Sequence, residues 1–189
     1  AGGSIDVFGG GNVGGNLDAA GNVNATAVGN FTADTHASGD VDVMAVGDVA
    51  ATISAGNDLN VVTYGAIDAT GLKVLWANHD LQAVGREGVT GTIGAGHDVR
   101  RVASYAGIDA AITAGDGVGE VTAWDDIAGS IAGDAVGSVR AGRLITATVS
   151  DANATVRAND SNVIGPYPQD PDISVASVTA ALNDGQRAV

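Results

Sequence analysis

The 189-residue chain contains 29 Gly, 3 Pro and no Cys, and its 8 Lys and Arg stand against 22 Asp and Glu. The absence of cysteine excludes disulfide bridges and cysteine-based metal or nucleophile chemistry. The net charge of −14 argues against nucleic-acid binding, which needs a basic surface. No apolar stretch is long enough to predict a membrane span. Because most of the acids are Asp and Lys73 is the sole lysine, the composition favours turns and strands over helices.

Aliphatic residues recur at a fixed interval along most of the chain. One series is spaced by 18, 18, 18, 22, 18, 19 and 18 residues: Ile5, Val23, Val41, Leu59, Leu81, Val99, Val118 and Val136. A second series lies half a period later, spaced by 18, 18, 18, 22, 19, 19 and 18: Val13, Phe31, Val49, Ile67, Val89, Ile108, Ile127 and Ile145. A repeat of this length predicts one coil of a stacked β-structure per period.

The predicted fold class is therefore all-β, a parallel β-solenoid (β-helix) of about eight coils of 18–19 residues, within residues 1–160. Gly-Asp or Gly-Asn turns join two half-coils in each period. A β-sandwich with a strand every nine residues is the alternative. It is disfavoured because sandwich strands do not need an in-register column of identical turn residues.

The two half-coils have different internal patterns. In the second series, large, small and large residues occupy alternate positions, as in Val13, Gly15 and Leu17, which predicts a flat strand with one inward face. In the first series the apolar partner is more often three residues on, which predicts a bulge or corner because an odd spacing cannot stay on one face. These pairs are Ile5/Phe8, Leu59/Val62, Leu81/Val84, Val99/Val102, Val118/Val121 and Val136/Val139.

Acidic and histidine side chains form columns at one turn. Asp58, Asp80 and Asp98 precede consecutive members of the first series, and His79 and His97 lie one residue earlier. Asp side chains in turns commonly bond the following backbone amides, and this alone would explain the column. The alternatives are a calcium (Ca²⁺) site built from Asp58, Asp80 and Asp98, or a transition-metal site at His79, Asp80, His97 and Asp98.

One irregularity interrupts the repeat. Both series stretch by four residues between Ile67 and Leu81, which locates an insertion there. Residues 72–76 have an alternating pattern, so we expect them to lengthen a strand or to protrude as a small flap that exposes Trp76. Recognition sites are often built on such irregularities of a regular scaffold.

A column of large side chains precedes the second series by three residues. It changes from aliphatic to aromatic along the chain: Val28, Val46, Tyr64, Arg86, Tyr105 and Trp124. If these side chains point outward, Tyr64, Arg86, Tyr105 and Trp124 form a ribbon stabilised by cation–π contacts, able to bind a sugar chain or a partner protein. The alternative is a corner stack that only stiffens the solenoid. Trp76 completes the candidate ligand-binding set.

The two ends of the repeat differ. All three prolines fall within residues 165–171, and proline cannot donate to a strand ladder, so residues 161–189 are expected to form a tail, a cap or one further strand. At the other end the repeat begins at Ile5 without a preceding polar cap. We expect this chain to be an excised piece of a longer solenoid or a subunit that stacks end to end with copies of itself.

Repeat units such as Gly39-Asp-Val-Asp-Val-Met-Ala-Val-Gly47-Asp-Val resemble the tandem repeats of large bacterial surface proteins, the filamentous-haemagglutinin-type β-helices in particular. The resemblance covers residues 5–158. It implies a right-handed β-helix, a secreted or cell-surface location, and an adhesive or structural role. The repeats of calcium-binding nonapeptide proteins and the Thr-x-Thr column of ice-binding solenoids do not recur here.

Taken together, these features predict a non-enzymatic extracellular scaffold, a filament or adhesin segment whose partners are copies of itself or flanking coils. A carbohydrate-binding module that uses the aromatic column to hold surface glycans is the first alternative. A polysaccharide lyase or epimerase is the second. It is disfavoured because a single lysine offers little cationic material for that chemistry.

Overall fold

The computed structural model describes residues 3–150 and 154–158, which form two parallel sheets. The odd sheet contains β1 (Ile5–Gly9), β3 (Val23–Ala27), β5 (Val41–Ala45), β7 (Leu59–Thr63), β9 (Leu81–Gly85), β11 (Val99–Ser104), β13 (Gly117–Ala123), β15 (Ala135–Ala141) and β17 (Thr155–Ala158). The even sheet contains β2 (Val13–Ala19), β4 (Phe31–Ala37), β6 (Ile53–Ala55), β8 (Ala66–Ala77), β10 (Gly88–Ala95), β12 (Ile108–Ala114), β14 (Ile127–Ala132) and β16 (Thr148–Val149). The predicted tail, residues 161–189, lies outside the described residues.

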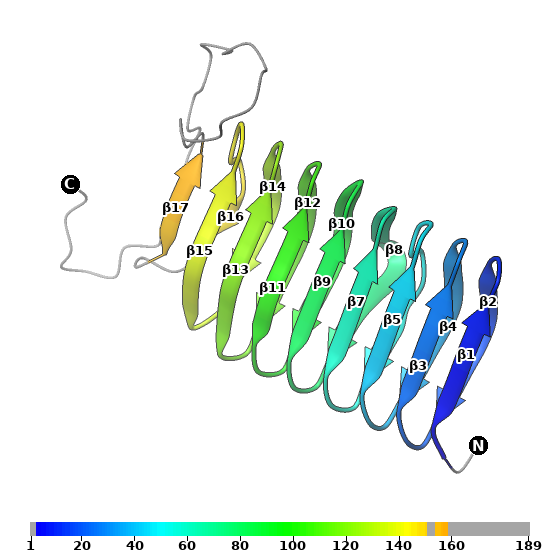
Figure 1. The fold of residues 1–189 in the computed structure, drawn as a ribbon. Helices are drawn as coiled ribbons and strands as arrows, with labels where there is room; N and C mark the ends of the chain where they lie inside the picture. The colour runs from blue at the N-terminus through cyan, green and yellow to red at the C-terminus, as the bar shows by residue number, and fades with distance from the viewer. Residues whose placement is uncertain (1–2, 151–153, 159–189) are drawn as a thin grey trace.

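Each strand pairs with the strand one coil away, and every pairing among the described strands is parallel (Figure 1). The first predicted series is confirmed residue by residue, because Val41 pairs with Leu59 and Leu59 pairs with Leu81. The second series is confirmed in the same way, partly through isolated bridges such as Phe31 to Val49. The solenoid is therefore the fold, and the β-sandwich alternative is wrong.

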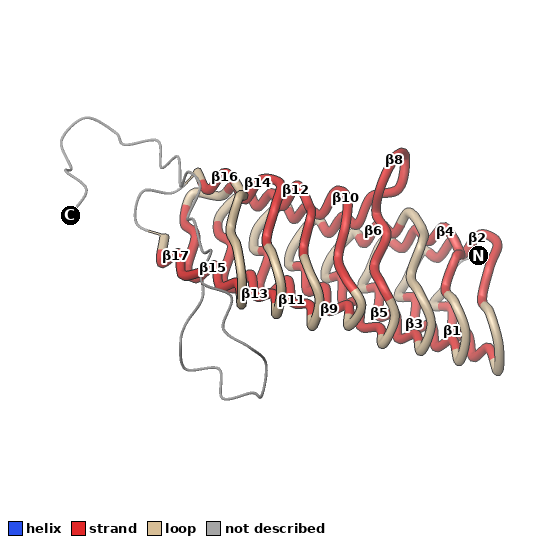
Figure 2. Tube along the Cα trace, turned by 90° about the horizontal axis from the view of Figure 1, so that it is seen from above, coloured by secondary structure: helices blue, strands red, loops and turns tan. Residues whose placement is uncertain are grey.

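The winding is right-handed. In Figure 1 the odd strands run upward in front, and the chain crosses to the even sheet behind before it returns to the next coil. Figure 2, seen from above, shows the two sheets as separate layers joined by these crossings. Right-handed crossovers between parallel strands are the general rule, because right-twisted strands pack back onto their own sheet only in that sense.

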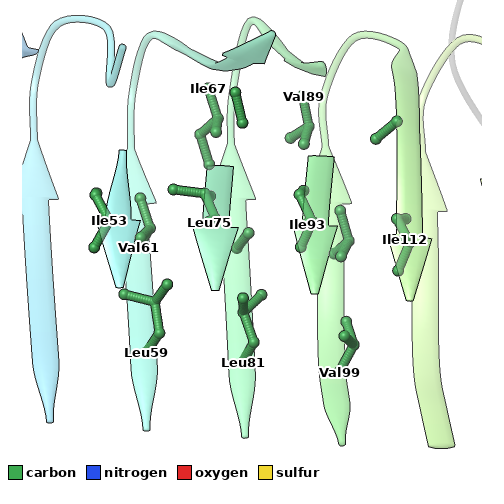
Figure 3. Close-up of a cluster of buried hydrophobic side chains, with 14 of the residues drawn as sticks. Ile53, Leu59, Val61, Ile67, Leu75, Leu81, Val89, Ile93, Val99 and Ile112 are labelled. Atoms are coloured by element: carbon green, nitrogen blue, oxygen red, sulfur yellow. The ribbon is translucent and has the colours of Figure 1, made fainter. Parts of the chain in front are cut away.

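The core is a thin layer of small and branched aliphatic side chains between the sheets. Figure 3 shows Leu59, Leu81 and Val99 of the odd sheet in successive coils, facing the column of Ile53, Leu75 and Ile93. All six are at most 1% exposed. Alanine fills many of the other inward positions, so the two sheets can approach closely.

The predicted bulge is present only in the later coils. In β11 the residue Arg100 has no partner in β9, because Val99 pairs with Leu81 and Arg101 pairs with Gln82. This extra residue turns Val102 inward, where it is fully buried. The same pattern continues through β13 and β15, and the spacing of three is explained there.

In the earlier coils the bulge prediction is wrong. The strands β1, β7 and β9 alternate without interruption, so the inward partner is two residues on rather than three. Phe8 is consequently 76% exposed. Val62 and Val84 are half-buried on the outer face.

The insertion consists of residues 70–73 and protrudes as a flap within β8 (Figure 2). Ala69 pairs with Gly91 and Val74 pairs with Thr92, so the regular register resumes directly after Lys73. Leu72, at the tip, is 97% exposed. The prediction of a flap is confirmed, but Trp76 belongs to the regular strand and not to the insertion.

Candidate functional site

The predicted Asp column lies at the corner where the even sheet leads into the odd sheet. Asp58 and Asp80 each accept a hydrogen bond from the backbone N–H of the counterpart in the next coil: Asp80 N donates to Asp58 Oδ1 at 3.2 Å, and Asp98 N donates to Asp80 Oδ1 at 3.2 Å. The amides come from the next coil, 18 or 22 residues later, rather than from the following residues of the same turn as expected. The column is therefore a ladder that links coils.

Arg100, the bulged residue of β11, closes this ladder with a positive charge. Its guanidinium contacts Asp80 Oδ2 and lies 4.0 Å from Asp58 Oδ2. Burial of the Asp80 carboxyl raises its pKa, but the hydrogen bonds from the Asp98 amide and the Arg100 guanidinium outweigh this effect and hold the pKa below its usual value. The protein thus supplies its own cation beside these two carboxylates.

The five predicted metal ligands do not form one cluster. Among the described residues, ligand atoms of Asp58, His79 and Asp80 lie within 4.8 Å of one another. His79 Nδ1 is 3.9 Å from Asp58 Oδ1. His97 turns instead to Asp116, with Nδ1 2.8 Å from Oδ2, and Asp98 lies outside the group of three.

Calcium binding gains no support from this geometry. Ca²⁺ takes six to eight oxygen ligands, whereas the group of three offers two carboxylates, both near the Arg100 guanidinium. A histidine with two carboxylates suits a transition metal better, but binding would have to displace Arg100. Metal binding therefore stays a prediction at these positions.

A groove of about 350 Å³ runs beside the Asp ladder on the outer face of the odd sheet. Amide and carboxylate side chains line its other wall and bond along the solenoid axis, because Asn60 Nδ2 donates to Asp42 Oδ1 at 3.1 Å and Gln82 Nε2 donates to Asn60 Oδ1 at 3.4 Å. The polar lining includes Asp40, Asp42, Asp58, Asn60, Asp80, Gln82 and Arg100.

The predicted aromatic column lies at the opposite corner, where the odd sheet leads into the even sheet. The strand register places Tyr64, Arg86, Tyr105 and Trp124 in four consecutive coils. Tyr64, Tyr105 and Trp124 are 60%, 69% and 51% exposed. The side chains point outward, but among the described residues the one contact between rings joins His79 and His97. The expected ribbon of mutually stacked groups is therefore absent in this structure.

Trp76 lies on a different surface, the outer face of the even sheet. Its Nε1 donates to Asn78 Oδ1 at 3.0 Å. The six-membered ring covers Gly94 of the neighbouring strand, where an added Cβ would lie 2.5 Å from the ring. Trp76 cannot act together with Tyr64, Tyr105 and Trp124 on one ligand face.

A second polar ladder at the aromatic corner was not predicted. Asn30 N donates to Asn12 Oδ1 at 2.9 Å, Asp48 N donates to Asn30 Oδ1 at 3.0 Å, and Ala66 N donates to Asp48 Oδ1 at 2.9 Å. The signal was available, since these residues directly precede members of the second series just as the Asp column precedes the first.

Comparison with known proteins adds no assignment. A scan against protein-family models found no match, and searches of curated proteins and of solved structures found none. Within the described residues no helix has the length and apolarity needed to cross a membrane. The chain is thus a parallel β-solenoid repeat protein by its fold, and the resemblance to filamentous-haemagglutinin-type repeats stays a prediction.

Proposed function

We propose that the chain is a non-enzymatic structural segment of a secreted or cell-surface filament or adhesin, whose coils continue a longer stack. One observation carries this proposal: the polar side chains at both corners are bonded to the neighbouring coil. The two ladders run through Asp40, Asp58 and Asp80 at one corner and through Asn12, Asn30 and Asp48 at the other. Side chains used in this way stiffen a rod.

The edge formed by β1 and β2 supports continuation of the stack. Each of these strands has a paired neighbour on one side in the described structure. The backbone N–H groups of Ile5 and Val13 donate to carbonyls of the next coil. Because successive residues of a parallel strand direct their N–H groups to opposite sides, the N–H groups of Phe8 and Asn16 point away from that coil, toward the unpaired edge. Such an edge is a template for a further coil, of the same chain or of another copy.

Electron microscopy of the purified chain, over a range of concentrations, tests this proposal. We expect end-to-end polymers, and we expect the double variant Phe8→Pro/Asn16→Pro to remain monomeric with an unchanged circular dichroism spectrum, because proline removes only the outward donors. The matched control Phe8→Ala/Asn16→Ala keeps both donors and should still polymerise. A wild-type chain that stays monomeric at high concentration would count against end-to-end stacking.

A carbohydrate-binding module is the second candidate, and the outward column of Tyr64, Tyr105 and Trp124 favours it. Tyr105 and Trp124 lie in successive coils, and Tyr64 lies two coils before Tyr105. These exposed rings could each support one sugar of an extended glycan, because aromatic faces pack on the apolar faces of sugars. Binding on a glycan array that is lost in Tyr105→Ala and Trp124→Ala, with Trp76→Ala as the control from the other sheet, would support this function.

A further inference from the structure

The outer face of the odd sheet is divided into two lanes that run along the solenoid axis. The acidic lane, beside the even-to-odd corner, contains Asp40, Asp42, Asp58 and Asp80 and includes the groove described above. The apolar lane lies next to it, toward the aromatic corner, and contains Met44, Val46, Val62, Tyr64 and Val84. The two lanes are adjacent because outward residues two apart on one strand, such as Asp42 and Met44, are neighbours on one face.

The apolar lane is continuous across coils. Met44 pairs with Val62, and Val62 pairs with Val84, so their side chains lie beside one another in successive coils. Met44 is 57% exposed and Val46 is 55% exposed. Most of the exposed large hydrophobic side chains in the described residues lie on this face or its aromatic corner, whereas Leu72 and Trp76 lie on the even sheet. Exposed apolar surface gathered on one face marks an interaction site.

The acidic lane carries an uncompensated negative charge. Its four carboxylates face one guanidinium, that of Arg100, which is committed to Asp80 and Asp58. Asp40 and Asp42 receive hydrogen bonds from neutral amides, those of Asn57 and Asn60. The chain as a whole has a net charge of −14. A cationic partner is therefore drawn to this lane, and an anionic one is repelled.

We infer that this face docks a cationic amphipathic segment of a partner protein, with its Lys and Arg side chains over the acidic lane and its apolar side chains over Met44, Val62 and Val84. Residues 1–189 do not supply such a segment, because their eight Lys and Arg residues are spread widely between Lys73 and Arg187. A neutral sugar chain would leave the acidic lane without a counterpart. The inference does not depend on end-to-end stacking.

Fluorescence anisotropy of the full chain with a labelled synthetic peptide tests the inference. The probe is a Leu/Lys peptide of about 18 residues with its leucines on one helical face. The first control peptide has the same composition in scrambled order, and the second is oligolysine of equal charge. Both retain the attraction to a negative protein but cannot place charged and apolar groups over the two lanes together.

Two double variants each weaken one lane. Asp42→Asn/Asp58→Asn removes two negative charges and keeps the oxygen acceptors. Asn is already tolerated at the equivalent positions of an earlier coil, since Asn24 is in the column of Asp42 and Asn22 is in the column of Asp58. Met44→Ser/Val62→Ser interrupts the apolar lane in two successive coils. Their matched controls on the even-sheet side are Asp34→Asn/Asp109→Asn and Leu72→Ser.

We expect saturable binding of the amphipathic peptide that weakens about tenfold in each lane variant and changes less than about twofold in the controls. Binding should also weaken as salt is raised, because exposed charges are screened. Equal binding of the scrambled peptide or oligolysine, or equal loss in the even-sheet controls, would overturn the inference in favour of non-specific attraction. Absence of peptide binding, with a neutral oligosaccharide bound through Val62 and Tyr64, would overturn it in favour of a glycan site.

Discussion

At the residue scale, the recurring Gly-Asp and Gly-Asn pairs have a specific structural purpose. The Asp or Asn accepts the backbone N–H of the next coil, and the glycine leaves room for the acceptor from the coil before. An added Cβ at Gly47 would lie 2.1 Å from Asn30 Oδ1, and one at Gly39 would lie 2.0 Å from Asn22 Oδ1. The abundance of Gly, Asp and Asn in the sequence therefore follows from the corner ladders.

The ladder predicts different effects for two substitutions of Asp58. Asp58→Ala leaves the Asp80 N–H without its acceptor, so we expect the free energy of unfolding to fall by about 1 kcal/mol. Asp58→Asn keeps the oxygen and should change stability much less. Urea unfolding followed by circular dichroism compares the two variants, and equal losses would show that the charge rather than the hydrogen bond matters.

An ion pair at the base of the flap has a testable pH dependence. Lys73 Nζ lies 2.8 Å from Asp68 Oδ2. The hydrogen bonds from Lys73 and Thr70 lower the pKa of Asp68 from 3.8 to about 2. Because the folded pKa is below the unfolded one, the pair contributes stability above about pH 4, and this contribution is lost as the pH falls toward 2. The contribution is small, since both side chains are more than a third exposed.

Replacement of the lysine isolates this effect. Lys73→Met should raise the pKa of Asp68 toward 3.8, measured by NMR titration of the side-chain carboxyl carbon. Lys73→Arg keeps a donor and a charge, so it should leave the pKa low. An unchanged pKa in Lys73→Met would mean that Thr70 and the flap backbone alone stabilise the carboxylate.

At the element scale, the bulge shows what the hydrophobic spacing could and could not predict. An aliphatic residue three positions on is inward in β11, as Val102 is, but outward in β7, as Val62 is. Spacing alone does not separate these cases because both residues are Val. The residue two positions on does separate them: it is the apolar Val61 in the plain strand and the charged Arg101 in the bulged one. Weighing that position would have located the bulge correctly.

The bulge column also explains two glycines. Arg100 can occupy the first bulge because β9, the strand below, has no bulged residue opposite it. In later coils the bulges stack on one another, and an added Cβ at Gly119 would lie 2.6 Å from the Arg100 carbonyl oxygen. An added Cβ at Gly137 would in turn lie 2.5 Å from the Gly119 carbonyl oxygen.

We therefore expect Gly137→Ala to lower the free energy of unfolding by about 1–3 kcal/mol, because the backbone must shift to accept the methyl group. Ser138→Ala, at the next residue on the same strand, is the control and should cost much less. Thermal unfolding of both variants measures the difference. A Gly137→Ala variant as stable as Ser138→Ala would show that the stacked bulges are less tightly constrained than these distances imply.

At the scale of the whole molecule, the coil register could be predicted because it depends only on periodicity. Residues 18 or 19 apart must be neighbours wherever one coil stacks on the next, so the predicted columns of Asp, His and aromatic residues are present as columns. The direction of each side chain could not be predicted in this way. His97 turns to Asp116 and Arg100 turns back to Asp80, and these choices depend on local rotamers and on the bulge. Val46 and Tyr64 of the apolar lane belong to the predicted column, whereas Val62 and Val84 were expected to face inward because outward Val residues resemble core residues in sequence.

The same periodicity makes the molecule divisible in units of one coil. Deletion of residues 41–58 removes one whole coil and joins Asp40 to Leu59. In the shortened chain Val23 would pair with Leu59, and Phe31 would pair with Ile67. Each column of equivalent residues therefore continues, with one residue fewer. We expect this variant to fold with a β-sheet spectrum and cooperative unfolding, because each coil contacts only its neighbours. In the Phe8→Pro/Asn16→Pro background, small-angle X-ray scattering should show a rod shorter by about 4.8 Å.

Deletion of residues 41–49 is the matched control and removes half a coil. It would place a half-coil of the even sheet at a position of the odd sheet. The inward side chains and the residues of both polar ladders would then lie next to non-equivalent residues of the neighbouring coils. We therefore expect an unfolded or aggregated chain. Similar folding of the two variants would show that stacking tolerates exchange of the half-coils. If neither variant folds, the coil of residues 41–58 contributes more than length to the solenoid. The most direct contribution is the Asp40–Asp58 hydrogen bond of the ladder, which the longer deletion replaces by a bond between Asp40 and Asp80.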